Sequence, residues 1–187
     1  MKRKIVIILI FFVVFILGFQ SYNLINYNRT LFNSVINKEG YSLQSLGKQP
    51  IEFFIKPEWI PNKSEVRKKV NQKLVKLHNT NLKLVDVTNN EWEMCFNMTT
   101  TYKFNQKEGK FMYIYLLNDD DTVTSNMSQH DYVLLDNKNN EIEMGSMGSG
   151  PDSDFSFCLD PENQKQILDG FKVKYNGFYL YKFTKND

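Results

Sequence analysis

The pattern of apolar and polar positions opens with one long apolar run. Residues 5–19 carry no polar side chain, and three basic residues precede them at positions 2 to 4. As a helix rising about 1.5 Å per residue, the run spans about 22 Å, and extension through residue 25 reaches the roughly 30 Å of a bilayer core. The pattern predicts a transmembrane signal-anchor over residues 5–25, with a basic flank at residues 1–4 that stays in the cytoplasm.

An apolar run of this length behind a basic flank is also typical of a secretory signal peptide, which is cleaved on export. Cleavage needs small residues in a defined arrangement, and residues 17–21 supply them poorly. We therefore expect a single-pass protein of the cell membrane whose C-terminal domain lies outside the cytoplasm. Secretion after cleavage is the alternative.

Two segments of different character follow the apolar run. Residues 24–36 place apolar side chains at helical spacing and predict a short stalk. Residues 37–50 contain two glycines and a proline without any period, which predicts a loop. We expect a stalk and linker over residues 26–50 and one extracytoplasmic domain over residues 51–187, which is long enough to bury a core.

Alternation of apolar and polar side chains dominates this domain and predicts short strands. An Asn176-Gly177 pair between two alternating runs predicts a final hairpin with a type I′ turn. Between Leu84 and Val85 the alternation slips by one position. The remaining strands are expected at residues 51–55, 82–87, 92–98, 99–104, 110–117, 131–135, 141–144 and 155–159.

One longer segment, residues 64–77, follows a helical period, with apolar side chains at positions 66, 70, 74 and 77 behind a serine N-cap. A strand from position 74 onward is the competing interpretation. A second short helix is expected within residues 161–168. Together the elements predict a mainly β protein, a single antiparallel β-sandwich of immunoglobulin-like kind with one or two short helices.

Charge is unevenly distributed along the domain. Residues 63–76 carry six positive side chains against one negative, a net of +5, whereas residues 118–169 carry twelve acidic side chains against two lysines, a net of −10. This asymmetry predicts a basic side and an acidic side, or attraction between copies. Solvated loops are the alternative.

The two cysteines, Cys95 and Cys158, permit one disulfide in an exported domain, and two free thiols are the alternative. Each cysteine lies on the face of its strand opposite the apolar side chains. A bond between them would therefore join neighbouring strands on the outside of one sheet.

The most unusual local stretch is rich in glycine and is a candidate binding loop, because loops on a rigid sandwich commonly carry recognition. It lacks the flanking helix and the lysine of a phosphate-binding loop, and a mobile connection between strands is the alternative. The candidate residues are Gly145, Ser146, Met147, Gly148, Ser149 and Gly150.

Two groups of acidic residues are candidates for calcium, which prefers carboxylate oxygens. The first group is Asp119, Asp120 and Asp121, and the second is Asp152 and Asp154. The EF-hand pattern is absent, and solvated turns are the alternative. The two histidines show no ligand spacing for zinc, and we expect no other cofactor.

The sequence shows no nucleophile motif in a suitable context, since the S-x-x-K match at residues 45–48 lies in the expected linker. We expect a non-enzymatic binding module that is anchored in the membrane through residues 5–25 and contacts an envelope or surface protein or polymer. Nucleic acid is disfavoured by export and by the acidic second half.

Two other functions remain open. One is a secreted or anchored hydrolase that uses acidic residues such as Asp119, Asp131 or Asp154. The other is a type II host or viral surface glycoprotein, because glycosylation sequons occur at positions 28, 62, 97 and 126.

Overall fold

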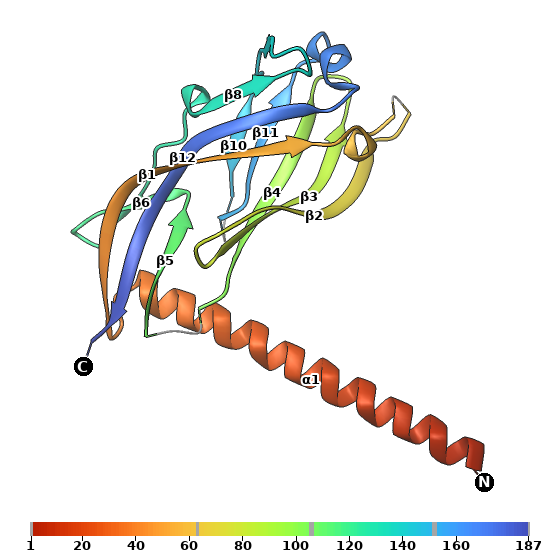
Figure 1. Ribbon diagram of the computed structural model, residues 1–187, viewed down its shortest axis with the longest axis vertical. Helices are drawn as coiled ribbons and strands as arrows, with labels where there is room; N and C mark the ends of the chain where they lie inside the picture. The colour runs from red at the N-terminus through yellow and green to blue at the C-terminus, as the bar shows by residue number, and fades with distance from the viewer. Residues whose placement is uncertain (1, 63, 105–106, 151–152, 187) are drawn as a thin grey trace.

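One long helix leads into a domain of antiparallel strands, so the protein is mainly β, as the alternating pattern predicts (Figure 1). The computed structural model describes residues 2–62, 64–104, 107–150 and 153–186; within the first helix it describes the side chains of residues 10, 12–20, 22–23 and 26–36.

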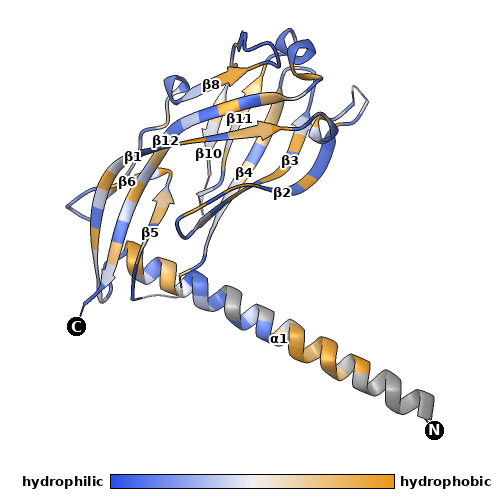
Figure 2. Ribbon diagram, in the orientation of Figure 1, coloured by the Kyte–Doolittle hydropathy of each residue, from blue (hydrophilic) through white to orange (hydrophobic). Residues whose placement is uncertain are grey.

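Helix α1 (Lys2–Ile36) is continuous, and its two halves meet different surroundings. Its last turns pack on the domain: Val35 is fully buried, and the Phe32 ring stacks on Tyr102 with centroids 4.0 Å apart. Toward its N-terminus the helix projects away from the strands, and Figure 2 shows an apolar stretch there. The described side chains of this stretch, at residues 10 and 12–19, are exposed. Within the described part of the chain, no helix combines the length and apolarity needed to cross a membrane.

The first sheet is organised around its longest partner, β12, which pairs with three other strands, all antiparallel. The order is β1-β12-β8-β9, and β5 pairs with the second half of β12 on the side where β8 pairs with the first half. The strands are β1 (Tyr41–Ile55), β12 (Phe171–Lys185), β8 (Tyr132–Leu135), β9 (Glu141–Ile142) and β5 (Glu108–Tyr113).

The second sheet has the order β10-β11-β4-β3-β2. A small separate hairpin and short 3-10 turns are also present among the described residues. The strands of the sheet are β10 (Met147–Ser149), β11 (Phe155–Leu159), β4 (Met94–Tyr102), β3 (Thr80–Asn89) and β2 (Arg67–Leu77). The hairpin is β6 (Tyr115–Leu117) with β7 (Val123–Ser125), and the 3-10 turns are Pro57–Trp59, Gln129–Asp131 and Asn163–Ile167.

The main core lies between the two sheets, which makes the domain sandwich-like. Phe96 of β4 stacks on Phe157 of β11, and both meet the edge of Phe171 on β12, with centroids 5.0 to 6.2 Å apart. All three rings are fully buried, and each contributes roughly 1.5–3 kcal/mol by leaving water.

A second, smaller core joins α1 to the domain. Phe104, Phe111 and Phe183 are buried together with Val35, and Phe32 packs on their edge. Because the helix contributes side chains to this cluster, its last turns are part of the domain and not a separate stalk.

The helix expected at residues 64–77 is wrong, because the segment forms β2. Positions 66, 70 and 74 are four apart, a spacing that a helix face and a strand face share, since four is also a multiple of two. β2 pairs with β3 through two register shifts, and these irregularities obscure its alternation in the sequence.

The linker expected at residues 37–50 is also wrong from Tyr41 onward, where β1 begins. Gly47, with a φ of +88°, and Pro50 both fall at register shifts between β1 and β12. A bulge accommodates the left-handed residue and the missing N–H, so these two residues bend the strand without ending it.

The hairpin expected at Asn176-Gly177 does not form, because β12 runs straight through both residues. They occupy the extra positions of a bulge opposite Pro50. Gly177 is required for a different reason than a turn: a Cβ there would overlap the hydroxyl of Tyr175.

Other boundaries shift by less. The two strands expected at residues 92–104 are the single strand β4, and the one expected at residues 110–117 is divided at Ile114 into β5 and β6. Within residues 161–168 the helix is a short 3-10 segment.

Candidate functional site

A row of polar side chains crosses the outer face of the second sheet. Asp86 of β3 lies opposite Asn97 of β4, which lies opposite Ser156 of β11. A bulge at Val85 turns Asp86 outward while Leu84 and Val87 both remain in the core. This bulge is the slip in the alternation of the sequence.

Asp86 is a buried carboxylate on an outer sheet face, with its side chain 3% exposed. Both Arg67 Nε, at 3.0 Å, and Arg67 Nη2 donate to Asp86 Oδ2. Asn97 Nδ2 donates to Asp86 Oδ1 at 2.8 Å. A charge is tolerated at this depth only when it is paired and hydrogen-bonded, so the three side chains hold one another in fixed positions.

These side chains line a hollow of about 390 Å³. The segment Gly148–Gly150 and the side chains of Asp154 and Ser156 also line it. Arg67 uses only part of its five N–H donors on Asp86, which leaves further donors for a ligand. The hollow therefore presents a fixed cationic donor group beside hydroxyl, amide and carboxylate oxygens.

The glycine-rich stretch reaches the hollow through its second half only. Met147–Ser149 form β10, which pairs with β11, and Tyr115 donates from its hydroxyl to the Gly150 carbonyl at 2.6 Å. In its first half, Ser146 Oγ donates to Glu93 Oε2 at 2.8 Å, and Gly145 donates from its N–H to the Cys158 carbonyl. The stretch is an edge of the sheet held by hydrogen bonds.

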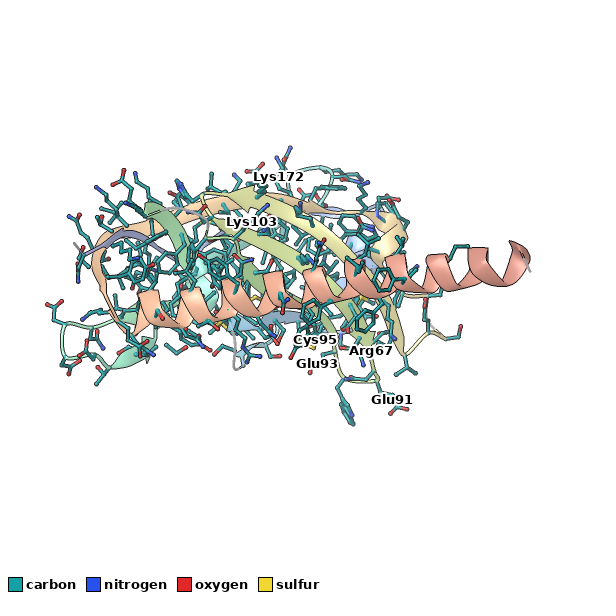
Figure 3. The ribbon with its side chains drawn as sticks, turned by 90° about the horizontal axis from the view of Figure 1, so that it is seen from below. Arg67, Glu91, Glu93, Cys95, Lys103 and Lys172 are labelled. Atoms are coloured by element: carbon teal, nitrogen blue, oxygen red, sulfur yellow. A yellow bond between two sulfur atoms is a disulfide. The ribbon has the colours of Figure 1, made fainter. Side chains whose placement is uncertain are left out.

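Cys95 and Cys158 are joined in a disulfide between directly opposed positions of β4 and β11. The bond lies on the outer face, beside the hollow, as the strand parity predicts; Figure 3 shows Cys95 with Glu93 and Arg67 on one side of α1 and Lys103 on the other. Among the described residues, one group of three metal-ligand side chains lies within 4.8 Å, namely Glu93, Cys95 and Cys158. Both sulfur atoms are occupied by the disulfide, so this group offers no thiolate to a metal.

The calcium candidates are divided between two places. Asp119, Asp120 and Asp121 lie at the turn between β6 and β7, where Thr122 donates to Asp120 from its hydroxyl and its N–H and lowers the pKa of that carboxyl. Asp121 pairs with Lys38 at 2.6 Å, and this hydrogen bond raises the pKa of the lysine. Asp154 lines the hollow instead, and Asp152 lies outside the described residues.

The carboxylates considered for hydrolysis also lie on separate elements. Asp131, in the 3-10 turn before β8, is buried and pairs with Lys48 of β1 at 2.5 Å. Asp119 is exposed at the β6–β7 turn, and Asp154 lies before β11. The structure does not assemble these three groups around one hollow.

The sequence does not predict the cluster of Arg67, Asp86 and Asn97, because nothing in the spacing of these residues links them. The one local signal was the slip at Val85. Comparison of the chain with protein-family models, with curated proteins and with solved structures gives no significant match.

Proposed function

We propose that this protein is a membrane-anchored binding module without catalytic activity. Its β domain lies outside the cytoplasm and holds a polar envelope component, a surface protein or polymer, in the hollow lined by Arg67, Asn97 and Ser156. Residues 5–25 anchor it in the membrane.

The observation that carries this proposal is the exposure of the described apolar side chains of α1 at residues 10 and 12–19. Phe12, Val13, Val14 and Phe15 are all more than half exposed although they follow one another in the sequence. Consecutive residues of a helix point about 100° apart, so these side chains cover the helix all round. A partner groove would require one apolar stripe, whereas a helix that is apolar on every side suits lipid.

The orientation is supported by charge and by the disulfide. Three basic residues precede the apolar run, and basic flanks favour the cytoplasmic side. The domain would then lie on the opposite side, where oxidising conditions maintain disulfides such as Cys95–Cys158.

The side chains that line the hollow suit a polar ligand that carries both hydrogen-bond donors and acceptors. Arg67 is held by Asp86, and its charge is offset by that of Asp86, while Asp154 adds a second carboxylate to the rim. Donors and acceptors are therefore both present and already oriented, which reduces the entropy lost on binding. Hydroxyl-rich glycan chains and polypeptide backbones have the matching chemistry.

Topology is tested with the full chain carrying a C-terminal tag in bacterial spheroplasts. We expect external protease to remove the tag before lysis and the chain to stay in the membrane pellet after alkaline carbonate washing. A tag protected until detergent is added would show that the domain is cytoplasmic, and a chain released by carbonate would show that α1 is not an anchor.

Ligand binding is tested by placing a photo-crosslinking amino acid at Ser149 in intact cells, with the exposed position Ser125 of β7 as the matched control. We expect a discrete adduct at Ser149 that Arg67→Ala abolishes and that Ser125 does not give. Equal adducts at both positions, or none at Ser149, would argue against the hollow as the binding site.

A further inference from the structure

Lysines gather at the end of the second sheet that lies beside α1. Lys73 and Lys76 of β2 and Lys103, just after β4, line a hollow of about 450 Å³ together with His78, Asn79 and Asn81. No carboxylate is among the described residues that line it. The hollow is thus positively charged and rich in hydrogen-bond donors.

A further lysine, Lys83, lies beside this group without lining the hollow. Lys73 lies directly across from Lys83 of β3, and like charges at opposed strand positions destabilise a sheet. Burial and the nearby charge of Lys110 lower the pKa of His78. Among the described ion pairs none involves Lys73, Lys83 or Lys103. An anion in the hollow would reduce this repulsion, and none of the described side chains that line the hollow is acidic.

The hollow lies where the helix leaves the domain. Asn79 accepts a hydrogen bond at its carbonyl from the N–H of Lys103, and the preceding residue, Tyr102, stacks on Phe32 of α1. A common cleft of about 310 Å³ is lined by residues 99–102 of β4 and by Asn28, Arg29, Phe32 and Asn33 of the helix. The helix α1 is continuous from Lys2 to Ile36. This end of the domain is therefore the end from which the apolar N-terminal stretch of the helix projects.

We propose that this basic hollow binds the phosphate of anionic lipid headgroups at the surface of the membrane that α1 enters. The inference rests on the proposed function for the membrane itself. Lysine ammonium groups are point charges suited to phosphate, and each contributes a modest attraction near an anionic surface. The contact would seat the domain on the bilayer at a fixed angle and leave the hollow at Arg67 accessible.

The test uses the full ¹⁵N-labelled chain in dodecyl maltoside micelles, titrated with dihexanoyl phosphatidylglycerol. We expect saturable shifts of the amides of residues 76–81 and of the His78 imidazole, and none with dihexanoyl phosphatidylcholine. The variant K73Q/K76Q/K103Q should bind about 100-fold more weakly, at about fivefold for each lysine. The matched control K138Q/K165Q/K174Q, with the same loss of charge at other exposed sites, should change affinity less than twofold.

Three results would overturn the proposal: an equal response to phosphatidylcholine, an equal loss in both triple variants, or inorganic phosphate binding as tightly as the lipid. The last result would make this a site for free phosphate. The single variant Lys103→Gln, expected to lose about fivefold, replaces the triple variant if that fails to fold. The topology and this inference can fail separately, because a micelle has no inner and outer side. A domain that proves cytoplasmic but binds phosphatidylglycerol would refute only the topology. A domain that proves exported but does not bind phosphatidylglycerol would refute only this inference.

Discussion

Removing Arg67 and removing Asp86 should have unequal effects on the stability of the domain, although the two side chains form one ion pair. Arg67→Ala leaves a carboxylate whose side chain is 3% exposed, with the amide of Asn97 as its remaining described partner. Breaking a buried pair in this way costs about 3 kcal/mol, because the charge cannot return to water. Asp86→Ala leaves a guanidinium that is 59% exposed and can be hydrated, so we expect a loss of about 1 kcal/mol.

Urea unfolding of the full chain in detergent, followed by near-ultraviolet circular dichroism of the aromatic core, measures both values. Lys69→Ala is the matched control, since Lys69 is exposed on β2 and lies across from Asp86; it should change stability by less than about 0.5 kcal/mol. The double variant of Arg67 and Asp86 should be more stable than Arg67→Ala by about 1 kcal/mol or more. A larger loss for Asp86→Ala than for Arg67→Ala would show that burial of the carboxylate is not the controlling cost.

Three further predictions concern other parts of the domain. Replacing Cys95 and Cys158 by serine should lower the free energy of unfolding by about 4 kcal/mol, because the disulfide closes a loop with a sequence separation of 63. Urea denaturation under non-reducing conditions measures this loss. A loss below about 1 kcal/mol would contradict the prediction. Gly177→Ala should cost about 1–3 kcal/mol through overlap with the tyrosine hydroxyl two residues earlier, whereas Gly148→Ala, with its nearest contact at 3.6 Å, should be almost neutral by the same assay. The pKa of His78 is lowered in the folded state by burial and by the charge of Lys110, so the unfolded chain binds more protons than the folded chain as the pH falls below about 6.5. Stability should therefore decrease there, and His78→Asn, which tolerates the left-handed backbone (φ +54°), should reduce that decrease. A variant with an unchanged pH profile would exclude His78 as the cause.

The β class of the domain was accessible from the sequence because alternation survives in most strands. Residues 155–159 alternate cleanly and form β11 at the expected positions. Where a bulge intervenes, the local pattern fails: residues 64–77 fit a helical stripe because spacings of four satisfy both periods, and β2 carries two register shifts. Local propensity misled in the same way at Asn176-Gly177, where pairing with β1 overrides the turn preference of the dipeptide.

The candidate site was less accessible, since it depends on register between strands distant in the sequence. Arg67, Asp86 and Asn97 belong to three strands, and their contact requires the bulge at Val85 and the exact pairing of β2, β3 and β4. The sequence indicated a candidate loop at residues 145–150 but could not indicate that only Gly148–Gly150 line the hollow. The disulfide was more predictable, because strand parity alone placed both cysteines on outer faces.

The central position of β12 has a consequence for biogenesis. A ribosome makes β1, β5 and β8 before β12, and each then lacks the neighbour with which it pairs in the finished sheet. Pairing of Tyr41 with Lys185 joins positions far apart along the polypeptide, and contacts of such long sequence separation lower the folding rate. Nascent molecules therefore expose unpaired sheet edges until this strand emerges, and during that interval they would depend on chaperones to avoid aggregation.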